Sequence, residues 1–230
     1  MGRPARLKSA AAPKALAGPR EQHRERLRAL TRQSILQAAE TVLLREGLDA
    51  LTLDAIAAEL GLTKQGLYYH YPSKEALLAE LALQEWTAVA DAVHAATAAA
   101  PNAADALEAL VRHYMARYAQ RLPMFRLATQ GSLLSPLAAS LARQQLERIR
   151  PLNDRMYGPT ERLLRAAQRV GRADAALDPR RLAFLAHTSA MGLLTMQLMV
   201  SSVDDPLRHA PKALVDELCR ALRAAVGGPG

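Results

Sequence analysis

The chain has 230 residues, half of them apolar, with one cysteine and a formal net charge of +8. The length allows a substantial core, and the lone Cys219 excludes an internal disulfide framework and fits a reducing compartment. Alanine is abundant and no run of β-branched residues alternates with polar ones, so we predict an all-α protein. Residues 1–20 lack the apolar segment of a secretory signal, and we therefore expect a cytoplasmic location.

The positive charge is concentrated at the N-terminus. Residues 1–32 contain nine lysines or arginines and two glutamates, which leaves the rest of the chain nearly neutral. A basic end on a near-neutral body indicates a polyanionic partner, nucleic acid before membrane, although a solvated tail that only aids solubility is the alternative. Residues 1–20 mix Pro, Gly, Ala and basic residues without periodicity, so we predict a disordered basic arm.

The first helix is expected to begin near Glu21. Apolar residues at helical spacing form its predicted buried stripe, which consists of Leu27, Leu30, Ile35, Ala38, Ala39, Val42 and Leu43. Gly47 stands where a glycine commonly ends a helix. This helix should therefore pack on the segments that follow it.

Two short helices come next. Thr52 is a suitable N-cap for the first, which Gly61 ends. Thr63 can cap the second, and that helix must end near Tyr71 because Pro72 disfavours helical geometry in the residue before it. Two short helices around a glycine-containing turn, with a longer helix behind them, indicate a helix-turn-helix unit over residues 21–72.

The remaining residues, 73–230, are predicted to form a second helical domain, which brings the total to about nine helices. The expected helices run from Ser73 to about Ala98, from Asn102 to Tyr118 before Pro123, irregularly over 124–134, from Ser135 to Gly171 with a break or kink at Pro151 and Gly158–Pro159, over about 179–200, and over about 211–226.

The second short helix carries side chains suited to DNA. In a major groove, Lys64 can donate to guanine and Gln65 can pair with adenine, while the missing side chain of Gly66 permits close approach. The aromatic residues at its end can meet sugar and phosphate, and Lys74 adds a phosphate contact. The DNA-binding residues predicted from this stretch are Thr63, Lys64, Gln65, Gly66, Tyr68, Tyr69, His70 and Lys74.

The stretch LTLDAIAAELGLTKQGLYYHYPSKEALLAEL, residues 51–81, resembles the DNA-binding domain of the tetracycline-repressor (TetR) family. The likeness covers about residues 28–82, and it is carried at the family's spacings by Gly47, Ala57, Gly61, Leu67, Tyr68, Tyr71 and Lys74. The resemblance implies a dimeric transcriptional regulator that binds operator DNA, usually a repressor released by a small molecule. It also implies that Thr52 and Lys74 hold phosphates, that Lys64, Gln65 and Gly66 face bases, and that Tyr68, Tyr69 and His70 flank the backbone. The charged arm before residue 25 departs from the minimal family pattern, so its role stays open.

Residues 183–203 contain no charged side chain, a length that could cross a bilayer. Polar residues dilute the segment and two arginines directly precede it, so we expect no membrane span. A helix apolar on all sides should be buried on all sides, which favours contact with a second subunit. The family precedent, an intersubunit four-helix bundle, agrees, and we predict a homodimer through about 179–200 and 211–226.

No catalytic signature is present, so no enzyme activity, cofactor or metal is expected; His94, His113 and His187 could converge, but unrelated histidines rarely form a metal site. Aromatic and methionine side chains in residues 73–230 suit a pocket for an apolar or amphipathic effector. The predicted ligand-binding residues are Trp86, Tyr114, Tyr118, Phe125, Met156, Tyr157, Phe184, His187 and Met191. We expect a ligand-controlled repressor; an architectural, nucleoid-type DNA-binding protein that senses no ligand is the alternative.

Overall fold

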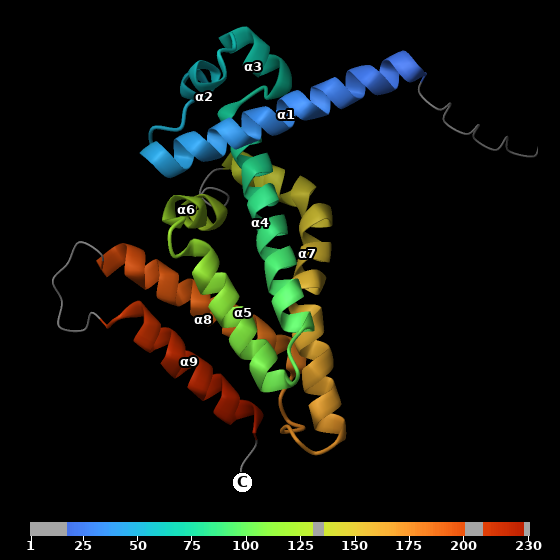
Figure 1. Cartoon of the computed structure of the whole chain (residues 1–230), viewed down its shortest axis with the longest axis vertical. Coiled ribbons are helices and arrows are strands. Elements are labelled where there is room, and N and C mark those ends of the chain that lie inside the picture. Colours follow the sequence, from blue (N-terminus) through green and yellow to red (C-terminus); the bar gives the residue numbers. More distant parts are fainter. Residues whose placement is uncertain (1–17, 131–135, 201–208, 228–230) are drawn as a thin grey trace, which may run out of the picture.

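The computed structural model describes residues 18–130, 136–200 and 209–227, and all regular structure in these ranges is α-helical (Figure 1). The nine helices are α1 (Pro19–Glu46), α2 (Leu53–Leu60), α3 (Lys64–His70), α4 (Lys74–Ala98), α5 (Ala103–Tyr118), α6 (Leu122–Gln130), α7 (Pro136–Arg169), α8 (Pro179–Val200) and α9 (Pro211–Val226). The predicted all-α fold is confirmed.

The helices form two regions along the long axis of the molecule. Helices α2 and α3 lie on α1 at one end, and α4 leads from α3 into the other region, where it packs on α5 and α7 (Figure 1). Helices α8 and α9 cover α5 on a further side. One hydrophobic cluster runs from Ile35 of α1 to Val226 of α9, so the two regions share a continuous core.

Side-chain caps set the starts of several helices. The hydroxyl oxygens of Thr52, Thr63 and Ser73 accept hydrogen bonds from the backbone amides three residues later, at 3.1, 3.2 and 3.1 Å, and satisfy amides that the helix itself leaves free. Gly61 ends α2 with φ at +63°, a conformation that costs glycine little. These caps fix the short helices where the sequence predicted them.

Helix α1 differs from its prediction at its N-terminal half. It begins at Pro19 after the N-cap Gly18, so Pro19 and Arg20 are helical although they were assigned to the arm; residues 1–17 of the arm lie outside the described residues. The buried stripe was wrong for Leu27 and Leu30, which are 50% and 53% exposed. Burial starts only at Ile35 because the N-terminal half projects beyond the other helices (Figure 1).

A break or kink was predicted at Pro151 and Gly158–Pro159; helix α7 continues through both prolines, so neither of them ends it. Proline at position 159 has no N–H to donate to the carbonyl of Arg155, four residues earlier. Nδ1 of His94 on α4 lies 2.9 Å from that carbonyl oxygen and supplies the missing hydrogen bond. A contact between helices therefore replaces the bond that proline removes.

Candidate DNA interface and interior aromatic cluster

The short helix α3 divides its side chains between core and solvent. Leu67 and the adjoining Tyr71 are 0% and 1% exposed and hold the helix against the core. Tyr68 and Tyr69 are 43% and 66% exposed, and Gln65 is also exposed. Leu67 and Tyr71 thus anchor α3, and its outer face is free to contact a partner.

Lys64 is held at the start of α3 by an ion pair with Asp54 of α2, with a distance of 2.9 Å between Nζ and Oδ2. This hydrogen bond raises the pKa of Lys64, so the ammonium group stays charged. Both side chains are exposed, and the pair can exchange for a contact to DNA at small cost. Asp54 thus holds Lys64 on the outer surface of the helix-turn-helix unit.

The lack of a side chain at Gly66 also has a role within the protein, besides the predicted close approach to DNA. A Cβ atom placed there would lie 3.3 Å from the Thr63 hydroxyl oxygen, which is a close contact. That oxygen accepts the hydrogen bond from the Gly66 amide that caps α3. The glycine therefore leaves room for the cap.

Two arginines of α1 reach the C-terminal end of α3. Arg32 donates from Nη1 to the carbonyl oxygen of His70 at 2.7 Å, and its guanidinium lies 4.3 Å from the Tyr71 ring centre. The guanidinium of Arg28 lies 5.7 Å from the ring centre of Tyr69. Burial lowers the pKa of His70, and both arginines lower it further, so this histidine is neutral at pH 7. This role was not predicted from the sequence, although the four-residue spacing of the two arginines places them on one helical face.

The predicted interface residues lie close together on this end of the molecule. Thr52, Lys64, Tyr68 and Lys74 line one surface depression between the starts of α2, α3 and α4. Thr52 and Thr63 also act as helix caps, which accounts for them without DNA. Their proposed contacts to phosphate would come in addition to that structural role.

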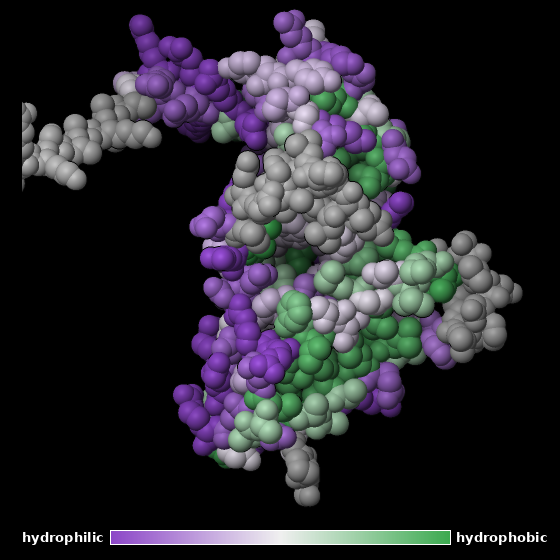
Figure 2. Space-filling model, turned by 180° about the vertical axis from the view of Figure 1, so that it is seen from behind, coloured by the Kyte–Doolittle hydropathy of each residue, from purple (hydrophilic) through white to green (hydrophobic). Residues whose placement is uncertain are grey.

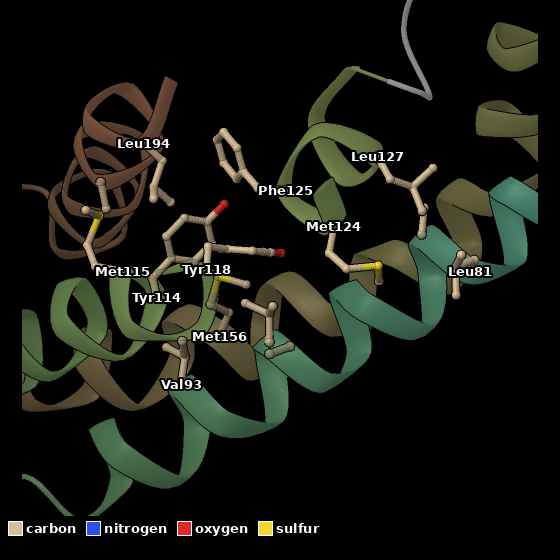
Figure 3. Packing of buried hydrophobic residues seen from close by; sticks show 14 of the residues in the cluster. Leu81, Val93, Tyr114, Met115, Tyr118, Met124, Phe125, Leu127, Met156 and Leu194 are labelled. Carbon is tan, nitrogen blue, oxygen red and sulfur yellow. The ribbon is translucent and has the colours of Figure 1, made fainter. Parts of the chain in front are cut away.

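In the second region, aromatic residues of α5 and α6 meet Met156 of α7 in the interior (Figure 3). Tyr114, Tyr118, Phe125, Met156 and Tyr157 are all less than 9% exposed. The ring of Tyr118 contacts Tyr114 and Phe125 edge to face, with centroid distances of 5.2 and 5.3 Å. Such pairs add packing energy beyond their buried area.

His187 of α8 closes this cluster. Its ring centre lies 4.5 Å from that of Tyr114, and a hydrogen bond of 2.6 Å joins its Nδ1 to the hydroxyl of Tyr157. Burial lowers the pKa of His187 to about 4 and raises the pKa of Tyr157 to about 12. Both side chains are therefore neutral at pH 7, and the polar atoms of the cluster can offer hydrogen bonds without charge.

The other predicted pocket residues are less buried. Trp86 and Met191 are half-buried and pack against the core. Phe184 is 50% exposed, and only one edge of it approaches the cluster, with its ring centre 6.1 Å from that of Tyr157. It therefore belongs mainly to the outer surface of α8.

A buried carboxylate on α4 lies beside the cluster. Glu85 is 2% exposed and accepts two hydrogen bonds from Arg117 of α5, at 2.9 and 2.7 Å. Arg121, just before α6, contacts Glu85 at 3.4 Å and Glu40 of α1 at 2.7 Å. This network was not foreseen, because sequence spacing alone does not bring α1, α4 and α5 together.

The outer face of α8 is apolar, and no other described part of the chain covers it. Phe184, Leu185, Met196 and Met199 are each at least half exposed, and Figure 2 shows the hydrophobic surface over α8 and α9. By length and composition α8 alone, among the described residues, is long and apolar enough to cross a membrane, and only 22% of its most apolar window is buried. An exposed patch of this kind marks an interaction site.

The three histidines considered for a metal have separate partners. His94 bonds the Arg155 carbonyl, His113 bonds the Ala109 carbonyl, and His187 bonds Tyr157. Across the described parts of the chain, no group of three or more His, Cys, Asp or Glu side chains could hold a metal ion.

The capped α2 and α3, with an exposed outer face on α3 and α1 behind them, define a helix-turn-helix DNA-binding protein. Residues 35–81 match the family described as "Bacterial regulatory proteins, tetR family". This match identifies residues 35–81 as a DNA-binding domain of the kind found in TetR-family regulators. None of the curated protein sequences compared with the chain matches it significantly.

Solved structures share the fold over most of the chain. A putative TetR-family regulator from Mesorhizobium loti is 23% identical, covering 87% of this chain and 98% of that one, with a TM-score of 0.61. A putative transcriptional regulator from Saccharomonospora viridis, solved in complex with choline, is 20% identical, covering 87% and 100%, with a TM-score of 0.67. The regulator FadR from Bacillus subtilis, solved in complex with stearoyl-CoA, is 15% identical, covering 84% and 98%, with a TM-score of 0.65.

Proposed function

We propose that this regulator is a homodimeric repressor whose binding to operator DNA is relieved by a small apolar or amphipathic effector held at the aromatic cluster. The observation that carries the proposal is the course of α4. This helix starts at Lys74, beside α3, and continues to Ala98 along the cluster, carrying Glu85 and Trp86. A rigid helix of 25 residues, about 37 Å long, mechanically joins the two sites.

The DNA-reading half of the proposal rests on the exposed face of α3. With α3 in a major groove, Gln65 and Lys64 at its N-terminal end meet base edges, and Tyr68 and Tyr69 meet the sugar-phosphate backbone. Lys74 at the start of α4 meets a phosphate. Thr52 and Thr63 combine capping with contact to the backbone, because a hydroxyl that accepts from an amide can still donate to a phosphate oxygen.

The effector half rests on the chemistry of the cluster. Its rings and methionines offer apolar contact, and the neutral His187 and Tyr157 offer hydrogen bonds. Phe184 and Met191 would stand at its rim, on the same helix as His187. The complexes of the two solved regulators with choline and with stearoyl-CoA support effector sensing by this fold.

The proposed dimer rests on the exposed apolar face of α8, with Leu214 and Leu218 of α9 half-buried beside it. A twofold interface would cover this face with its own copy. Two α3 helices would then lie about one turn of DNA apart, near 34 Å, or a multiple of it. A tilt of α4 of a few ångströms at either end would change that spacing and release the operator.

Selection of duplexes from a randomised pool supplies the operator, and Trp86, the sole tryptophan, reports on the effector site. Stearoyl-CoA and choline are the first probes. The one that binds should change Trp86 fluorescence, and the selected duplex should weaken its affinity by roughly 5- to 150-fold, the usual range of coupling. A probe that binds equally tightly with and without the duplex would contradict the repressor mechanism.

An architectural role is the competing function. A regulator should prefer its selected duplex over random DNA by about 10³-fold or more, whereas an architectural protein should show little preference. The same selection therefore decides between the two.

A further inference from the structure

The N-terminal half of α1 carries positive charges that no other part of the described chain neutralises. The arginine row, which is Arg20, Arg24 and Arg28, has four-residue spacing and so lies along one side of the helix. Within the described residues no carboxylate lies at ion-pair distance from these three, although Glu21 and Glu25 line the same surface. By contrast, Arg117, Arg148 and Arg180 in the second region each pair with a carboxylate.

Within the described parts of the chain, this half of α1 is also free of packing. From Pro19 to Leu30 every residue is exposed, and Figure 1 shows the segment projecting sideways past α2, α3 and α4. Like charges four residues apart destabilise a helix by a few tenths of a kcal/mol per pair in the free protein. A polyanion along the row would remove that repulsion.

The arginine row leads directly to α3. Arg28, its last member, lies over the ring of Tyr69, and the next arginine in the series, Arg32, bonds the carbonyl of His70. In Figure 1 the free end of α1 points away from α8 and α9, at about the level of α3. A duplex seated on α3 would continue past the row, on the side away from the dimer interface.

We propose that the arginine row binds the DNA backbone on the outer flanks of the operator, beyond the base pairs that α3 reads. From Arg20 to Arg28 the helix rises about 12 Å, which corresponds to three or four base pairs. Phosphate contacts of this kind add affinity and fix position without reading sequence. The inference rests on the proposed seating of α3 in a major groove and on the proposed dimer.

The test compares two duplexes with the full-length protein. One ends at the outer edges of the selected half-sites, and the other carries ten further base pairs of arbitrary sequence on each side. The wild type should bind the long duplex more tightly, and Arg20→Gln/Arg24→Gln should remove that advantage. The slope of log affinity against log salt on the long duplex should become shallower by about 1.8 per subunit, because two phosphate contacts are lost.

Arg26→Gln is the matched control for Arg24→Gln. It removes the same charge from the same exposed segment, but the side chain lies about 200° around the helix from Arg24. The control should keep the advantage of the long duplex, while Arg24→Gln should reduce it. Equal losses from both variants would show that only total charge matters, and would contradict the proposal that the arginine row itself contacts the DNA backbone.

Other outcomes are equally decisive. If the wild type selects a duplex but binds the short and long forms equally, the row does not contact DNA, while the proposed function stands. If the wild type selects no duplex, the proposed function itself fails. If the double variant loses binding to phosphatidylglycerol vesicles yet keeps the advantage of the long duplex, the row serves an anionic membrane surface and the proposal is overturned.

Discussion

Arg121 and Glu40 form an ion pair with a distance of 2.7 Å between Nη2 and Oε1, and this contact ties the segment before α6 to α1. Because Arg121 also contacts Glu85 on α4, three parts of the chain meet at one guanidinium. The two ends of the network differ in burial: Glu40 is 29% exposed at its side chain, whereas Glu85 is 2% exposed. They should therefore contribute unequally to stability.

Replacing Glu85 should cost more than replacing Glu40. Glu85→Gln leaves Arg117 without its carboxylate partner in a partly buried site, and we expect a loss of about 2–4 kcal/mol in the free energy of unfolding. Glu40→Gln removes a more exposed contact and should cost about 1 kcal/mol or less. Urea unfolding at fixed protein concentration measures both. Equal costs would mean that burial of Glu85 does not set the strength of the network.

The stability of the protein should fall as the solution is acidified from pH 7 to pH 5. The folded-state pKa of His187, about 4, lies below its ordinary value near 6.5 because the ring is buried. Above pH 6.5 the ring is neutral in both states; between 6.5 and 4 only the unfolded state takes up the proton, so stability is lost as the pH falls. The loss between pH 7 and pH 5 should be about 2 kcal/mol.

His187→Gln tests the assignment of this pH dependence, because glutamine does not titrate. Urea midpoints at pH 7, 6 and 5 should vary less in the variant than in the wild type. His113→Gln, at an exposed position, is the control and should keep the wild-type profile. If His187→Gln keeps it too, another group causes the acid sensitivity.

The residues predicted to contact bases and those predicted to contact phosphates should differ in their effects on DNA binding. Gln65→Ala and Lys64→Ala should each reduce discrimination at one base position by roughly 1–3 kcal/mol, because a base contact distinguishes sequences. Lys74→Ala should weaken binding to all duplexes alike, since a phosphate carries no sequence. Affinities for the selected duplex and its single-base variants measure both effects. A uniform loss for Lys64→Ala would place that lysine on a phosphate and leave base reading to Gln65.

The sequence predicted those parts of the fold that local chemistry determines. Thr52, Thr63 and Ser73 cap helices because their hydroxyls reach the amide three residues on, and this depends on no distant contact. The apolar spacing of α1 was misread at Leu27 and Leu30, because periodicity shows which face is apolar and not whether anything covers it. At Pro159 the local rule predicted a break or kink; the helix continues there, and His94, 65 residues away, bonds the carbonyl that proline leaves without its helical partner.

The candidate sites also differ in how far the sequence could predict them. The DNA interface occupies one continuous stretch, so the sequence could name its residues, although their contacts to DNA stay predictions. The aromatic cluster was only partly predictable: helical spacing suggested inward faces for Tyr114 and Tyr118, but it could not separate them from Phe184, whose ring lies half outside. The arginine contacts to α3 and the Glu85 network required the three-dimensional arrangement.

Dimerisation through α8 should be abolished by a charge at Gly192. This residue is exposed on the same helical face as Phe184, Leu185 and Met199, and a Cβ atom there would meet nothing within 4 Å in its own chain. Gly192→Glu should therefore leave the subunit folded and place an unpaired carboxylate in the proposed interface, where burial of a charge is costly. We expect a monomer by light scattering at micromolar concentration, an unchanged helical circular dichroism spectrum, and loss of binding to the selected duplex, since a single half-site binds weakly. Ala92→Glu, at an exposed position of α4, is the matched control and should remain dimeric. If Gly192→Glu still gives dimers that bind DNA with wild-type affinity, this face of α8 does not form the interface.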